Sequence, residues 1–192
     1  MWPRISFDPV NLFDLRVSDL MLHDPHFASR WLQATWDELG DDLLIGLLNS
    51  PDVVGFYCEM CPERAEALRL GVESMRHRPE ERVRKAEACL VAASWPWNLG
   101  MAKSPAVWDA LPWSYWDPSV IYDRVDLAGS TVLDIGAGTG QVTIRCAPFA
   151  ELVYALEPVA SLRRYIEHKT HAAGLRNVRT ILVPATTAMK LS

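Results

Sequence analysis

Three glycines at alternate positions follow a short apolar run in the second half of the chain. Residues 131–135 lead into Gly136, Gly138 and Gly140, and Asp134 stands two positions before the first glycine. Because glycine lacks a Cβ atom, a turn built from it can adopt positive φ, and a ligand can approach its backbone closely. The sequence therefore predicts a ligand-binding turn between a buried strand and a helix whose first amides offer unpaired donors.

A second acid stands at the end of the next apolar run. Glu157 follows residues 152–156 and comes 17 positions after Gly140. A carboxylate at such a strand end can accept hydrogen bonds from both hydroxyls of a ribose. The glycine turn and the acid together predict a site for a cofactor that contains a ribose.

The spacing of the glycines distinguishes between cofactor classes. Nicotinamide and flavin sites carry G-x-G-x-x-G, whereas here the third glycine comes one residue earlier and position 141 is Gln. A P-loop is excluded because no Gly-Lys-Ser/Thr follows. The pattern D-x-G-x-G-x-G, with an acid at the next strand end, resembles that of class I S-adenosylmethionine-dependent methyltransferases. The resemblance covers about residues 117–192, including a helix that stops at Gly174 and a third strand.

This resemblance implies a set of contacts to S-adenosylmethionine. The backbone of the glycine turn is expected at the amino-acid part of the cofactor, with Asp134 near the amino group and Gln141 near the carboxylate. Glu157 matches the family's ribose-binding acid, and Pro158 matches the residue beside the adenine. The expected cofactor contacts are Asp134, Gly136, Ala137, Gly138, Gly140, Gln141, Glu157, Pro158, Ala185 and Thr186.

The C-terminal end departs from the family pattern in two ways. After the third strand the family places a small residue and then an acid near the adenine amine, and here Ala185 fits while Thr186 offers only a hydroxyl, a weaker partner. The chain also stops at Ser192, where the family continues with a fourth strand that would pair with residues 131–135. We therefore expect a truncated copy of a longer protein, with an open apolar edge on that strand.

The elements expected along the chain fall into two regions. Residues 24–94 have a helical pattern, with prolines where first helical turns tolerate them and with two amphipathic stretches, 65–75 and 83–93, and an irregular connector follows at 95–118. Beyond them, strands at 131–135, 152–156 and 178–183 alternate with helices, which predicts parallel pairing and right-handed crossovers. The predicted fold is an all-α N-terminal region, residues 1–115, followed at 116–192 by the first half, about three strands, of a Rossmann-like doubly wound parallel sheet.

Composition and charge exclude several classes of protein. The 192 residues are 49% hydrophobic and 22% charged, which excludes a disordered chain. A net charge of −5 without a strong basic cluster argues against nucleic acid as a partner. The sequence contains no run of about 20 apolar residues, so no membrane span is expected. Acids near the N-terminus argue against a secretory signal, and a cytoplasmic location is therefore expected. Cys58-x-x-Cys61 lacks a second close pair, so no metal site is expected.

The predicted function is transfer of a methyl group from S-adenosylmethionine to an unidentified acceptor. Two alternatives remain open: an NAD(P)-dependent oxidoreductase, and a non-catalytic protein that binds a cofactor or a partner. The residues that bind the acceptor in this family follow the fourth strand or come from an N-terminal cap. The sequence therefore assigns no catalytic residue, no acceptor and no oligomeric state.

Overall fold

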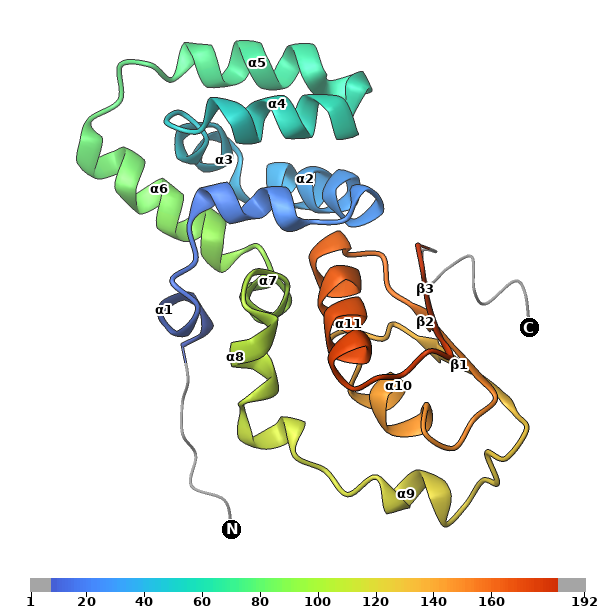
Figure 1. The fold of residues 1–192 in the computed structure, drawn as a ribbon. Helices are drawn as coiled ribbons and strands as arrows, with labels where there is room; N and C mark the ends of the chain where they lie inside the picture. Colours follow the sequence, from blue (N-terminus) through green and yellow to red (C-terminus); the bar gives the residue numbers. More distant parts are fainter. Residues whose placement is uncertain (1–7, 183–192) are drawn as a thin grey trace. The chain divides into compact units, whose positions relative to one another are not determined.

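The chain forms two compact units that divide between Lys103 and Ser104 (Figure 1). This is seen in a computed structural model, which describes residues 8–182. The sequence analysis places the boundary later, between residues 115 and 116. The two positions differ because Asp109, before residue 115, hydrogen-bonds to side chains of the α/β unit.

The first unit is built from helices. Its core includes several fully buried leucines, among them Leu32, Leu43 and Leu68. The two amphipathic helices expected from the sequence are confirmed as α5 and α6. The helices of this unit are α1 (Pro9–Leu12), η1 (Val17–Leu22), α2 (Pro25–Leu39), α3 (Asp41–Gly46), α4 (Pro51–Met60), η2 (Pro62–Arg64), α5 (Ala65–Ser74), α6 (Glu80–Ala92) and α7 (Pro96–Lys103).

A largely buried histidine joins three segments of the helical unit. His23 Nδ1 lies 2.9 Å from the Tyr57 hydroxyl oxygen, and its Nε2 lies 3.4 Å from the carbonyl oxygen of Ser94. The rings of Phe27 and Trp31 lie 4.7 Å and 5.2 Å from the imidazole, measured between centroids. Burial lowers the pKa of His23 from 6.5 to about 4, since the imidazolium would lose its hydration there. The folded unit therefore holds the neutral imidazole.

We expect the helical unit to lose stability as the pH falls from about 6.5 to about 4. In this window the unfolded chain binds a proton at His23 more readily than the folded chain, so the free energy of unfolding rises with pH. The contribution, about 3 kcal/mol, is complete above the unfolded-state pKa of 6.5 and is lost below the folded-state value. Urea unfolding followed by circular dichroism at pH 4 to 8 measures it.

The control for this prediction compares two histidines. His23→Gln should flatten the pH dependence between pH 4 and 6.5, whereas the same change at the exposed His77 should leave it as in the unaltered chain. Equal slopes in the two variants would contradict the assignment to His23.

The second unit contains all the strands of the described residues. The three strands are parallel in the order β1-β2-β3, with Thr131 opposite Leu152 and Val153 opposite Val178. The predicted mixed α/β class and the parallel three-stranded sheet are thus confirmed. The elements of this unit are α8 (Pro105–Asp109), η3 (Pro112–Ser114), α9 (Ser119–Tyr122), β1 (Thr131–Ile135), α10 (Gln141–Cys146), β2 (Leu152–Leu156), α11 (Ala160–Ala172) and β3 (Val178–Ile181).

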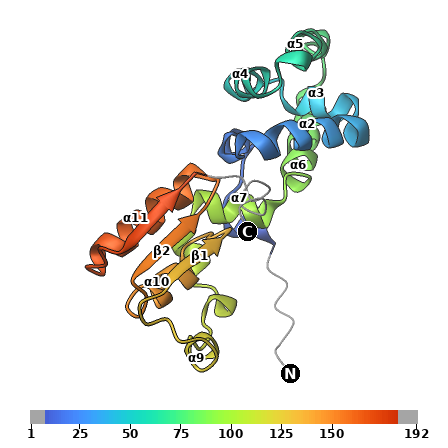
Figure 2. The same cartoon turned by 90° about the vertical axis from the view of Figure 1, so that its right-hand side faces the viewer.

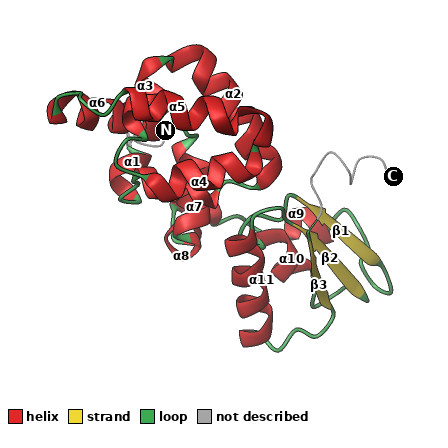
Figure 3. Cartoon of the chain, turned by 90° about the horizontal axis from the view of Figure 1, so that it is seen from above, coloured by secondary structure: helices red, strands yellow, loops and turns green. Residues whose placement is uncertain are grey.

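Helices α10 and α11 lie on the same side of the sheet (Figures 2 and 3). Val132 faces this side and packs against a cluster that includes Cys146 of α10 and Val153 of β2. Leu133 and Ile135 alternate with it along β1 and are 50% and 45% exposed. Among residues 8–182, β1 pairs only with β2, as the sequence predicts for an open apolar edge. Within the same range, no helix has the length and apolar character needed to cross a membrane.

Candidate functional site

All three glycines of the turn after β1 have left-handed backbone conformations. The φ angles are +73° at Gly136, +57° at Gly138 and +79° at Gly140. Residues with a Cβ atom adopt this region at a cost of about 1–2 kcal/mol each, because Cβ approaches the following carbonyl oxygen. The alternating glycines are therefore required by the path of the chain between β1 and α10.

Gly140 is also required by packing against α11. A Cβ atom at this position would lie 2.8 Å from Cγ1 of Ile166, which is fully buried. Ile166 shares a cluster with Ala137 of the turn and Ala155 of β2. The missing Cβ thus lets α11 and the turn meet over the end of the sheet.

We expect Gly140→Ala to lower the free energy of unfolding of the α/β unit by about 3 kcal/mol. Backbone strain at positive φ and overpacking against Ile166 both contribute. Gly129→Ala is the matched control, because Gly129 has φ of +68° and open space where its Cβ would be, so only the backbone cost of about 1 kcal/mol remains. Urea unfolding of both variants measures the difference, and equal losses would show that the contact with Ile166 does not matter.

The amides of the glycine turn are bonded to the end of β2. Gly136 N and Ala137 N donate to the Leu156 carbonyl oxygen at 2.9 Å and 3.0 Å. Gly138 N donates instead to a side chain, at 2.8 Å from Oε2 of Glu157. The first two bonds fix the turn to the sheet through the main chain. The third depends on the carboxylate of a side chain.

Glu157 is buried at the carboxyl end of β2, where the sequence analysis expects a ribose-binding acid. It is 5% exposed, and its Oε1 accepts a hydrogen bond from Val159 N at 2.8 Å. Arg163 Nη1 donates to the main-chain oxygens of Glu157 and Pro158, at 2.7 Å each. The sequence analysis did not single out Arg163, which fixes this strand end six residues from the acid.

Asp134 connects β1 to α10. Its Oδ2 accepts hydrogen bonds from the amide and the hydroxyl of Thr143, at 3.0 Å and 2.6 Å, and Thr143 is fully buried. This carboxylate therefore orients the first turn of α10. The resemblance places Asp134 near the amino group of a cofactor, and the structure adds this positioning role within the fold.

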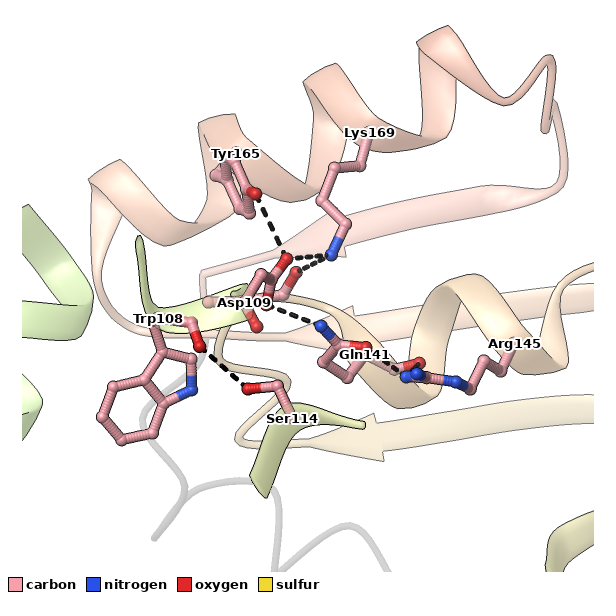
Figure 4. A network of polar contacts seen from close by, with 8 residues as sticks. Trp108, Asp109, Ser114, Gln141, Arg145, Tyr165 and Lys169 are labelled. Carbon is pink, nitrogen blue, oxygen red and sulfur yellow. Dashed lines mark hydrogen bonds and ion pairs between the residues drawn. The ribbon is translucent and has the colours of Figure 1, made fainter. Parts of the chain in front are cut away.

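The side chain of Gln141 belongs to a cluster that the sequence did not reveal (Figure 4). Its Nε2 donates to Oδ1 of Asp109 in α8 at 2.6 Å. Oδ2 of Asp109 accepts from Lys169 Nζ at 2.6 Å and from the Tyr165 hydroxyl at 3.1 Å, both on α11. Lys169 Nζ also donates to the Thr139 carbonyl oxygen at 3.0 Å, within the glycine turn. We call Asp109, Gln141, Tyr165 and Lys169 the Asp109 network.

The protonation states in the Asp109 network follow from these contacts. Burial by itself would raise the pKa of Asp109, but hydrogen bonds from Lys169, Thr139 and Gln141 outweigh it, so the pKa lies below its ordinary value. Burial raises the pKa of Tyr165 to about 12, and the negative charge of Asp109 adds to this. At neutral pH Asp109 is therefore a carboxylate and Tyr165 a neutral phenol.

The outer side of Gln141 is covered by a cation and an aromatic ring. Arg145 Nη1 donates to the Gln141 side-chain oxygen and, at 3.1 Å, to its main-chain oxygen. The Arg145 guanidinium lies 4.7 Å from the ring centroid of Trp116. Both ends of the Gln141 amide therefore have partners, and its Nε2 points to Asp109.

Two of the expected cofactor contacts, Ala185 and Thr186, lie outside the described residues. Cys58 and Cys61 are buried free thiols. In the described part of the chain, no group of three or more His, Cys, Asp or Glu residues could hold a metal ion.

Comparison of the chain with protein-family models, with curated proteins and with solved structures gives no match. The candidate site combines a glycine turn, a buried acid at the end of the next strand, and a carboxylate held by donors from α10 and α11.

Proposed function

We propose that the α/β unit is a Rossmann-like domain that binds S-adenosylmethionine, and that the protein transfers its methyl group to an acceptor. The observation that supports this most directly is the position of Glu157. Its buried carboxylate lies at the carboxyl end of β2, within hydrogen-bond distance of the glycine turn at the end of β1. In open parallel sheets, ligands bind at this end of the strands.

The residues present fit a ribose and the group attached to it. Each oxygen of Glu157 accepts a backbone hydrogen bond, which fixes the carboxylate at the strand end where an acid can accept from the hydroxyls of a ribose. Beside Gly136, no other described atom lies within 4 Å of the place where a Cβ would stand. A ligand can therefore approach the main chain of the turn there.

The roles of the chain's own residues in methyl transfer are binding and orientation. When bound, S-adenosylmethionine would supply a sulfonium methyl group for in-line transfer, in which the C–S bond breaks and S-adenosylhomocysteine leaves. The glycine turn, held to Leu156, fixes the place of the amino-acid part, and Glu157 fixes the ribose. Positioning of this kind can contribute much of the rate enhancement in a two-reactant displacement. No residue is assigned here to the acceptor or to proton removal.

The proposal predicts that S-adenosylmethionine binds and that Glu157→Gln weakens binding at least tenfold. The variant loses the charge and one acceptor that the ribose hydroxyls need, which costs about 1.4 kcal/mol or more. Isothermal titration calorimetry measures the affinity, and circular dichroism verifies that the variant is folded. Glu151→Gln, at an exposed acid just before β2, is the matched control and should bind as the unaltered chain does.

The same titration separates the alternatives. Tight binding of NADH in place of S-adenosylmethionine would favour an oxidoreductase, because an acid at the end of β2 also suits the ribose of a dinucleotide. Undiminished binding by Glu157→Gln would contradict the proposal, because it would show that Glu157 does not bind the ribose. A chain that binds S-adenosylmethionine but shows no turnover with any acceptor would be a cofactor-binding protein without catalysis.

A further inference from the structure

We infer that α8 closes part of the cofactor site, with Asp109 held by the side chains that would otherwise bind the carboxylate of S-adenosylmethionine. This inference rests on the proposed function and concerns its regulation. The site would exist in a closed form, in which Asp109 occupies the donors, and an open form, in which the cofactor's carboxylate replaces it.

The donors to Asp109 come from two helices. Three side chains from two helices, Gln141, Tyr165 and Lys169, converge on the carboxylate of Asp109 within 3.1 Å (Figure 4). One of them, Gln141, is the residue that the family resemblance places near the cofactor's carboxylate. Its Nε2 already has a carboxylate oxygen 2.6 Å away, which is supplied by this chain itself.

The Asp109 network is also linked to the glycine turn. Lys169 Nζ bridges the Asp109 carboxylate and the carbonyl oxygen of Thr139, which lies between Gly138 and Gly140. Asp109 therefore sits directly beside the turn where the amino-acid part of the cofactor is expected. The side chains of Asp109 and Lys169 are only 15% and 22% exposed, so water competes weakly for this ion pair.

Asp109 and the carboxylate of the cofactor would compete for the same donors. The cofactor's carboxylate has the charge and shape of the Asp109 side chain, so the same donors can hold either group. Holding both at once is disfavoured, because the two negative charges would repel each other beside one lysine. Since Asp109 is part of the same chain, it competes at a high effective concentration, and the cofactor's apparent affinity falls with the fraction of open sites.

Helix α8 is short and partly exposed. It is a five-residue helix, and Val107 in its middle is 42% exposed. At its end, the Trp108 carbonyl oxygen accepts a hydrogen bond from the buried Ser114 hydroxyl at 2.9 Å. The Asp109 network ties this helix to α10 and α11, so displacing the carboxylate would remove that tie.

The test compares two ligands and two variants by calorimetry. Asp109→Asn keeps the shape of the side chain and removes the charge that Lys169 pairs with, so S-adenosylmethionine should bind about tenfold more tightly. 5′-Methylthioadenosine carries the nucleoside without the amino-acid part and should bind the variant and the unaltered chain equally. Asp123→Asn changes an exposed carboxylate further along the same unit and should leave both affinities unchanged.

Hydrogen exchange gives a readout that does not depend on affinity. Adding S-adenosylmethionine to the unaltered chain should increase deuterium uptake in residues 105–111, because α8 is released, while 5′-methylthioadenosine should not. Decreased uptake there would overturn the inference, as would equal or weaker binding of S-adenosylmethionine by Asp109→Asn. If the unaltered chain binds neither ligand, the proposed function fails and the inference fails with it, whereas normal binding without these differences refutes the inference alone.

Discussion

The attachment of the glycine turn to the end of β2 is the constraint on which the candidate site depends. Two backbone bonds to Leu156 and one to the Glu157 side chain hold the turn, and positive φ at every second residue lets the chain follow that path. The lack of a Cβ at Gly140 then allows α11 to pack against it. Without these features, the acid at the end of β2 and the turn would not meet.

Three carboxylates surround this turn and differ in what they bind. Asp134 accepts from Thr143 and so serves the fold, since both its donors belong to α10. Glu157 accepts from two backbone amides, which hold it in place at the end of β2. Asp109 accepts from side chains only, and side chains can exchange one carboxylate for another at small cost to the backbone. The partners, more than the residue type, separate a structural acid from an exchangeable one.

Local signals in the sequence predict most of the secondary structure of the α/β unit. The apolar runs, the alternating glycines and Gly174 each act within a few residues, so the strands, the turn and the end of α11 could be predicted from them. The position of Glu157 also follows, because parallel strands bring their carboxyl ends together. Its bond to Gly138 could not be predicted, since it depends on the exact register of β1 and β2.

The Asp109 network could not be predicted from the sequence. Asp109 is separated from Lys169 by 60 residues, and nothing in the surrounding residues indicates that it turns toward α11. Tyr165 and Lys169 stand four positions apart on one helix, which is a recognisable pair, but the pair does not reveal its partner. The same long-range contact explains why the compact α/β unit begins at Ser104, before the first strand signal.

The order of contacts along the chain has a consequence for synthesis on the ribosome. Each strand pairs with the next strand in sequence, so the sheet can assemble progressively from β1 to β3 as the chain emerges. The Asp109 network needs α11 and closes a much longer loop, so it forms after the glycine turn is already in place. Asp109 emerges before its donors Gln141, Tyr165 and Lys169, so it is available to pair with them as soon as α11 has folded.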